Sequence, residues 1–136
     1  MTMMKFASAR IITDDLDRLV GFYEQVTGLP AERPAPVFAE IVMPGATLAI
    51  GHSDTVALFA PGCAHAAGNH TVLIEFQVDD VEADFKRLQG LVEDWVQDPT
   101  TLPWGNRSIV FRDPDGNLIN LYTPVTPEAI SRLSGR

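Results

Sequence analysis

Hydrophobic and polar positions change their spacing several times along the chain. Residues 5–13 alternate in the manner of a strand, and residues 16–26 then repeat apolar side chains at helical spacing. Asp14 or Asp15 is placed to cap that helix, and Gly28 to end it. The first segment of the chain is therefore predicted to be a strand followed by a helix.

The rest of the first half is predicted to be strands and a connection. Residues 30–36 contain three prolines, which indicates a loop or a short edge strand. Apolar stretches on both sides of Pro44-Gly45 indicate a hairpin. Residues 53–70 are rich in small residues and are interpreted as a linker.

The second half is predicted to contain the same order of elements as the first. A strand, a helix and three strands are expected at residues 71–78, 79–90, 91–97, 107–112 and 117–123. Residues 98–106 are expected to form a loop, and the turn signal Asp-Pro-Asp-Gly at 113–116 joins the last two strands. A terminal helix is predicted at 126–134, with Pro127 at its first position.

These two halves form an internal repeat. The acidic run that caps the first helix recurs 65 residues later, and the Gly-x-x-Leu/Ile-x-Ile/Leu strand pattern recurs 71 residues later. The predicted modules are residues 5–52 and 71–123, each of βαβββ order. Pairing the two modules edge to edge gives an α+β fold: a curved eight-stranded mixed sheet around a cleft, with helices outside.

Composition narrows the classes of function. The chain of 136 residues has a net charge of −8, which disfavours nucleic acid and anionic membrane surfaces as partners. Its one cysteine, Cys63, excludes an internal disulfide and a multi-thiolate metal site. No apolar stretch approaches the ~20 residues of a membrane span, and the first ten residues do not read as a signal peptide. We therefore expect a cytoplasmic protein.

Three sequence blocks carry a resemblance to a known family. They are DDLDRLVGFYEQVTGL, FQVDDVEADFKRL and, most specifically, PWGNRSIVFRDPDGNLINLY. With the strands before them, they resemble the vicinal oxygen chelate superfamily over about residues 5–123. That superfamily includes glyoxalase I, extradiol dioxygenases and bleomycin-resistance proteins. The resemblance implies a homodimer with a small-molecule cleft and, in many members, one divalent metal ion.

The positions that hold the metal in the superfamily carry unusual residues here. The resemblance places them at Ser8, Ala49, Leu73 and Asn120. A hydroxyl, a methyl, an isobutyl and an amide group do not form a site for a first-row divalent metal, which prefers imidazole, thiolate or carboxylate. We expect no metal and no other cofactor.

Strand periodicity predicts what lines the cleft instead. Phe6, Ser8 and Arg10 share one face of the first strand, and Glu75 and Gln77 share the matching face in the second half. A four-residue turn at 113–116 would pair Arg112 with Asn117. That register places Arg107, Ile109 and Phe111 on the side of Leu118, Asn120 and Tyr122.

The charged residues of this predicted cleft have two interpretations. Arg10, Glu75 and Arg107 either neutralise one another or recognise a ligand. Glu75 is also a weak candidate for a general base. Trp104 either stacks on a ligand or packs its loop onto the domain. We expect no chemical role for Cys63, His65 and His70, because a mobile linker holds a rigid constellation poorly.

The sequence thus predicts a metal-free protein that binds or sequesters a small, partly aromatic molecule, as the antibiotic-resistance branch does. The acidic composition favours a cationic ligand, whereas the two predicted cleft arginines favour an anionic one. The alternative is an enzyme: a metal-independent lyase or isomerase, or a dioxygenase-type enzyme with other metal ligands. A third interpretation is a binding module that regulates a neighbouring protein.

Overall fold

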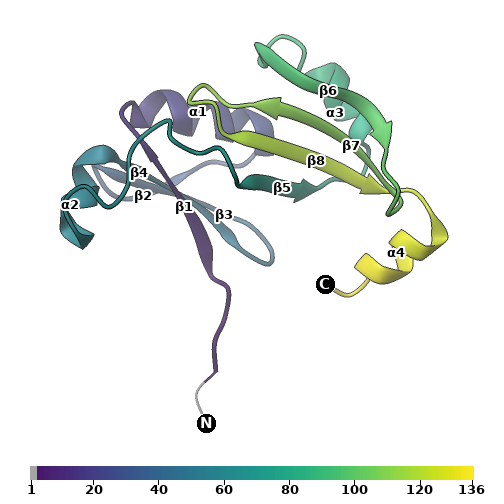
Figure 1. Ribbon diagram of the computed structural model, residues 1–136, viewed down its shortest axis with the longest axis horizontal. Coiled ribbons are helices and arrows are strands. Elements are labelled where there is room, and N and C mark those ends of the chain that lie inside the picture. The colour runs from purple at the N-terminus through teal and green to yellow at the C-terminus, as the bar shows by residue number, and fades with distance from the viewer. Residues whose placement is uncertain (1–2) are drawn as a thin grey trace. The chain divides into compact units, whose positions relative to one another are not determined.

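The structure is a computed structural model that describes residues 3–136. The chain divides into two compact units, the first ending at Gly68 and the second spanning Asn69–Arg136. In each unit a strand is followed by a helix, three strands and a final helix (Figure 1). The predicted repeat of the α+β fold is therefore confirmed.

Unit 1 forms a four-stranded mixed sheet. In chain order its elements are β1 Ser8–Thr13, α1 Leu16–Thr27, β2 Glu32–Ala35, β3 Phe38–Val42, β4 Thr47–His52, the 3-10 turn η1 Ser53–Thr55 and α2 Val56–Phe59. The strands lie in the order β1-β4-β3-β2, with β1 parallel to β4 and the other pairs antiparallel. Residues 30–36 thus contain the edge strand that was one of the two predicted alternatives.

Unit 2 repeats this topology. Its elements are β5 Leu73–Gln77, α3 Val81–Arg87, β6 Asp94–Thr101, β7 Asn106–Arg112, β8 Leu118–Pro124 and α4 Pro127–Leu133. The strands lie in the order β5-β8-β7-β6, with β5 parallel to β8. Each unit has its own sheet, and the joining of the two sheets into one of eight strands stays a prediction.

The same capping chemistry starts the main helix of each unit. The Asp15 carboxylate accepts the Arg18 N–H at 3.2 Å, and the Asp80 carboxylate accepts the Ala83 N–H at 3.1 Å. Helix α1 ends at Gly28, whose φ of 71° is the left-handed conformation that glycine adopts without strain. The apolar stripe of α1 is buried, and Tyr23 in it is fully buried.

The structure corrects one strand boundary and resolves part of the linker. Strand β6 runs from Asp94 to Thr101, so the prediction of a strand at 91–97 and a loop at 98–106 is wrong. Strand β6 is an edge strand, where proline is tolerated, and its register shifts between Trp95 and Thr100. The first seven residues of the predicted linker 53–70 are helical, as η1 and α2. No helix within residues 3–136 is both long and apolar enough to cross a membrane.

Candidate functional site

The two faces of the unit 2 sheet differ in polarity and burial. The face toward α3 carries four fully buried apolar side chains, Ile109, Phe111, Ile119 and Leu121. The opposite face is here called the open face of unit 2. According to the strand register, it is formed by Leu73, Glu75, Gln77, Asn106, Ser108, Val110, Arg112, Leu118, Asn120 and Tyr122.

The register between β7 and β8 differs from the predicted one. Arg112 pairs with Leu118, not with Asn117, so the connecting loop has five residues, 113–117. Asp113 closes this loop: its N–H donates to the Asn117 carbonyl at 2.9 Å, and its carboxylate accepts the Asn117 N–H at 2.9 Å and side-chain amide at 2.7 Å. A slip of one residue turns every side chain of a strand to the other face. The prediction that Arg107, Ile109 and Phe111 face the same side as Asn120 is therefore wrong.

Phe111 belongs to an aromatic cluster under α3. Its ring lies 5.3 Å from that of Trp95, which in turn lies 4.8 Å from that of Phe85, both in edge-to-face geometry. The indole nitrogen of Trp95 is buried and has no hydrogen-bond acceptor among residues 3–136. In unit 2, Phe111 thus contributes to the packing of α3 on the sheet and is absent from the open face.

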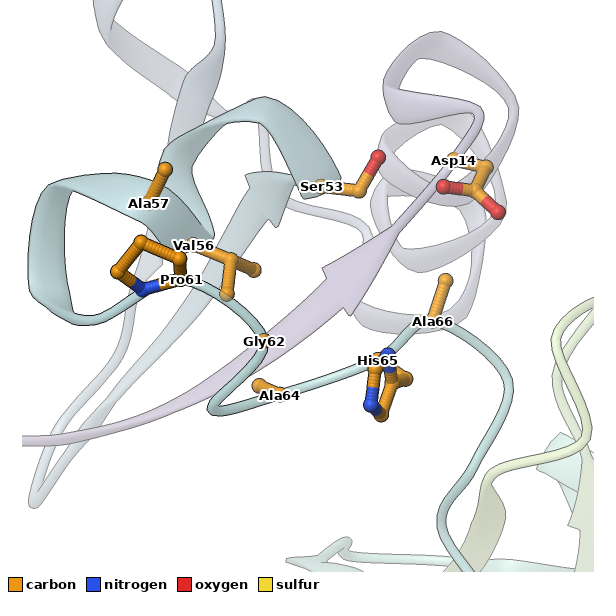
Figure 2. A pocket seen from close by; sticks show the side chains of 9 residues that line it. All are labelled: Asp14, Ser53, Val56, Ala57, Pro61, Gly62, Ala64, His65 and Ala66. Atoms are coloured by element: carbon orange, nitrogen blue, oxygen red, sulfur yellow. The ribbon is translucent and has the colours of Figure 1, made fainter.

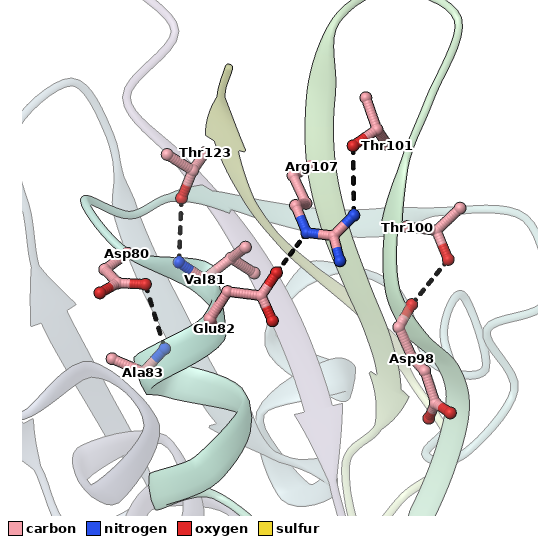
Figure 3. Close-up of polar contacts among 9 residues, drawn as sticks. All are labelled: Asp80, Val81, Glu82, Ala83, Asp98, Thr100, Thr101, Arg107 and Thr123. Carbon is pink, nitrogen blue, oxygen red and sulfur yellow. Dashed lines mark hydrogen bonds and ion pairs between the residues drawn. The ribbon is translucent and has the colours of Figure 1, made fainter.

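Arg107 also lies on the helix side of the sheet. Its Nε donates to the Glu82 carboxylate of α3, and its Nη1 donates to the Thr101 hydroxyl at 3.2 Å (Figure 3). The N-terminus of α3 is fixed nearby by Asp80 and by the Thr123 hydroxyl, which accepts the Val81 N–H at 3.1 Å. The charge of Arg107 is therefore balanced by Glu82, and Glu75 stands on the opposite face.

A row of three hydrogen-bonded side chains crosses the open face of unit 2. The Ser108 hydroxyl donates to the Asn120 side-chain oxygen, and the Asn120 amide donates to Glu75 Oε2 at 2.7 Å. Ser108 is fully buried and Asn120 is 7% exposed, whereas Glu75 is exposed. We call Ser108, Asn120 and Glu75 the polar row. The prediction of cleft residues missed Ser108, because the four-residue turn placed it on the other face.

The surroundings of the polar row are mostly apolar. Leu73 is 45% exposed, and Val110, Leu118 and Tyr122 are half-buried. Asn106 lies two residues before Ser108 on the same face, is 7% exposed, and its buried oxygen has no donor within the described chain. An unsatisfied buried acceptor costs roughly 1–3 kcal/mol. Beside Gln77 and the ion-paired Arg112, the open face of unit 2 thus presents acceptor oxygens next to apolar side chains, which suits a ligand with a flat apolar body and polar hydrogens.

The equivalent face of unit 1 carries Arg10 in place of a carboxylate. Arg10 pairs with Ala49 across the β1–β4 ladder, as Glu75 pairs with Asn120 across β5–β8. Its guanidinium lies 4.2 Å from the ring centre of Phe38 and 5.5 Å from that of Phe59 in α2. Ser8 is exposed on the same face of β1. Arg10 is thus held by aromatic rings of its own unit.

Two predicted aromatic contacts are largely exposed. Phe6 precedes β1 and is 74% exposed, and Trp104 is 56% exposed on the loop before β7. The Trp104 carbonyl accepts a hydrogen bond from the Arg132 side chain of α4 at 3.1 Å. Because its backbone is anchored while its indole is exposed, Trp104 retains the geometry of a stacking residue.

A separate hollow of about 510 Å³ lies in unit 1, where the linker passes the start of α1. Figure 2 shows Ser53 directed toward Asp14, with His65 lying apart from both. The remaining lining consists of small or apolar residues, and Cys63 and His70 are exposed outside it. This arrangement does not bring the linker residues into a catalytic constellation.

The donor groups of the four metal-ligand positions do not fit a divalent metal ion. In unit 1, Ala49 offers a buried methyl group beside the cationic Arg10. In unit 2, Leu73 is aliphatic, and Asn120 is already bonded to Ser108 and Glu75. Among the described residues no group of three or more His, Cys, Asp and Glu side chains is placed to hold a metal ion.

Comparisons with known proteins agree with the fold. The family model "Glyoxalase/Bleomycin resistance protein/Dioxygenase superfamily" matches residues 5–121. A glyoxalase/bleomycin resistance protein/dioxygenase from Nocardioides is 23% identical with a TM-score of 0.75, covering 93% of this chain and 87% of that one. A family enzyme from Burkholderia phytofirmans PsJN is 17% identical with a TM-score of 0.79, covering 90% of this chain and 100% of that one.

A third similar structure is TioX from Micromonospora sp. ML1. It is 24% identical with a TM-score of 0.67, and the match covers 90% of this chain and 100% of that one. No curated protein matches the chain. At these identities the solved structures establish the fold alone.

Proposed function

Because the chain belongs to the glyoxalase/bleomycin resistance protein/dioxygenase superfamily, we propose that it binds a small, partly aromatic molecule without a metal ion and without transforming it. This superfamily hosts several chemistries on one fold, so the function depends on the residues of the site. The observation that carries the proposal is the open face of unit 2, a sheet face with a hydrogen-bonded polar row among apolar side chains.

The state of Asn120 supports a metal-free site. The Asn120 side chain is held within the polar row, because its oxygen accepts from Ser108 and its nitrogen donates to Glu75, so only one lone pair of the oxygen remains. A neutral amide is also a weaker donor to first-row metals than a carboxylate. Ser8, Ala49 and Leu73 add no stronger ligand.

A second candidate function rests on Glu75. Its carboxylate is exposed, and Asn120 fixes one of its oxygens, which is the arrangement expected of an oriented general base. In this version the protein is a metal-independent lyase or isomerase. The two candidates differ in whether a bound molecule is recovered unchanged.

The proposal includes a cytoplasmic homodimer. Strands β1 and β5 are edge strands within their own units, and unpaired edges are commonly covered in native proteins. Pairing of modules, within one chain or between two copies, would cover them. The single exposed cysteine, Cys63, fits a reducing compartment.

Elemental analysis of protein purified without chelator tests the metal-free site. We expect substoichiometric zinc, nickel, iron and manganese, and no rise in melting temperature when these ions are added. Asn120→Ala serves as the matched variant: a stoichiometric ion that this substitution releases would contradict the proposal. A thermal-shift screen of aromatic molecules, followed by chromatography of the recovered compounds, separates binding from turnover.

A further inference from the structure

The direction of the hydrogen bonds in the polar row determines what the open face of unit 2 offers to a ligand. Ser108 donates to the oxygen of Asn120, so the amide nitrogen of Asn120 is turned toward Glu75 and donates to Oε2. The hydrogens of the row therefore point toward Glu75, whose other oxygen, Oε1, has no donor among the described residues. The polar row therefore ends at the exposed Glu75 carboxylate, which the Asn120 amide holds in place.

The charge of Glu75 is not balanced within the described chain. No ion pair joins it to a Lys, Arg or His among residues 3–136. Arg107 is bound to Glu82 on the other face. Arg112 lies on the open face, but its Nε is 3.6 Å from the Asp94 carboxylate and its Nη1 donates to the Gly116 carbonyl at 3.0 Å. A bound cation would thus meet Glu75 as an unpaired carboxylate.

Asn106 adds an independent observation. Its side-chain oxygen is buried on the same face and has no donor within the described chain, although the residue is 7% exposed. Buried polar atoms are normally satisfied, and each exception calls for an explanation. The register places this second acceptor opposite Pro124, four residues along β8 from the Asn120 that pairs with Glu75, so the face carries two separate acceptors without a donor.

We propose that the ligand of the open face of unit 2 is a planar molecule with a protonated nitrogen group, such as an amidinium or an aromatic amine cation. Its N–H groups donate to Glu75 Oε1, and its flat body lies against Leu118 and Tyr122. This inference rests on the proposed function and adds the chemical class of the ligand. Of the two predicted cleft arginines, Arg107 is absent from this face, and Arg10 belongs to unit 1, where it lies over Phe38.

Three ring compounds of nearly the same shape test the proposal: benzamidinium, benzamide and benzoate. Binding to the isotope-labelled full chain is followed by the NMR signals of the Asn120 side-chain amide and the Tyr122 backbone amide. A charge-assisted hydrogen bond is about twice as strong as a neutral one, so we expect benzamidinium to bind about tenfold more tightly than benzamide. Benzoate should bind most weakly.

The variants Glu75→Gln and Glu82→Gln distinguish an effect of the carboxylate on the open face from an effect of net charge. Both remove one negative charge from unit 2, but Glu82 lies on the helix side with Arg107. We expect the preference for benzamidinium to disappear in Glu75→Gln and to persist in Glu82→Gln. Melting curves of both variants verify that they are folded.

The outcomes distinguish this inference from the proposed function. If benzamide or benzoate perturbs the same signals as tightly as benzamidinium, the cationic class is overturned while binding stands. A preference that persists in Glu75→Gln overturns the role of Glu75. If none of the three compounds perturbs the open face at roughly 10 mM, where even a weak fragment of this size would register, the proposed binding function itself is overturned.

Discussion

The open face of unit 2 and the equivalent face of unit 1 differ in charge at matching positions. The units share their topology and their aspartate-capped helices, yet Arg10 faces Ala49 in one and Glu75 faces Asn120 in the other. One unit holds a cation on aromatic rings, and the other holds an anion on an amide. The repeat therefore preserved the scaffold, while the residues of the open faces diverged in charge.

The helices that follow the last strands, α2 and α4, also differ between the two units in the side chains that they contribute. In unit 1, α2 brings Phe59 toward Arg10, and Thr55 lies close to Gly51 of β4. In unit 2, α4 packs on Gly105, and its Arg132 binds the Trp104 carbonyl. A glycine thus makes a close contact in each unit, Gly51 of β4 with Thr55 of η1 and Gly105 of the loop before β7 with α4, but the two final helices bring different side chains to the neighbouring surface.

Phe111→Ala should have the largest effect, because it removes a fully buried ring from the cluster under α3. We expect a loss of about 3–5 kcal/mol in the free energy of unfolding, measured by denaturant titration. Tyr122→Ala, at the half-buried aromatic residue of the open face, should cost less. If Phe111→Ala does not fold, Phe111→Leu should still fold, with a smaller loss because fewer buried carbon atoms are removed. Equal losses for Phe111→Ala and Tyr122→Ala would contradict the assignment of the two faces.

Gly105→Ala should have the next largest effect. A Cβ at this position would lie 2.1 Å from Thr126 Oγ1 and 2.8 Å from Ala129 Cβ, and φ is +91°. Gly116→Ala is the control that measures backbone strain without a steric clash. Its φ is +85°, and no atom lies within 4 Å of the Cβ that alanine would add. We expect Gly116→Ala to cost about 1–2 kcal/mol, and Gly105→Ala to cost about 1–3 kcal/mol more.

Gly51→Ala is the unit 1 counterpart of this test. Its Cβ would meet Thr55 Oγ1 at 3.0 Å, with no positive φ, so it should cost less than Gly105→Ala. Hydrogen exchange in α4 should rise only in Gly105→Ala. An unchanged exchange rate there would mean that α4 does not depend on its contact with Gly105.

The smallest effect is expected from a double-mutant cycle on Arg10→Met and Glu75→Gln. Each charge has a partner inside its own unit, namely Phe38 for Arg10 and Asn120 for Glu75. The coupling free energy should therefore stay below about 0.5 kcal/mol, and Arg10→Met alone should cost about 0.5–1 kcal/mol. A coupling well above this value would favour the interpretation in which the two charges neutralise each other.

The sequence predicted the elements better than the faces of the strands. Helix α1 and the hairpin around Pro44-Gly45 follow from capping residues and periodicity, which are local signals. The register of β7 depends on one residue of loop length, which the Asp113 side chain fixes through hydrogen bonds to Asn117. Because Ile109 and Phe111 are apolar, their alternation indicates that they lie on the buried face. The prediction placed them on the opposite face because it assumed a four-residue turn.

The candidate site was predicted in part for the same reason. Glu75, Asn120 and Tyr122 lie on one face of unit 2, as periodicity in β5 and β8 indicates. Ser108 could not be assigned to this face from the sequence, because its position depends on the pairing register between β7 and β8. The bonding of Asn120 to both neighbours depends on side-chain geometry that no sequence spacing contains.

The five-residue loop at 113–117 has a consequence for how this sequence tolerates change. Most surface loops accept insertions and deletions, because their length affects only the connection. Here the loss or gain of a single residue would exchange the two faces of β7, sending Ser108 toward α3 and Phe111 into solvent. Deleting one residue from this loop should therefore change the pairing register of β7 with β8. A substitution at the exposed Pro114 keeps the loop length and should leave that register unchanged.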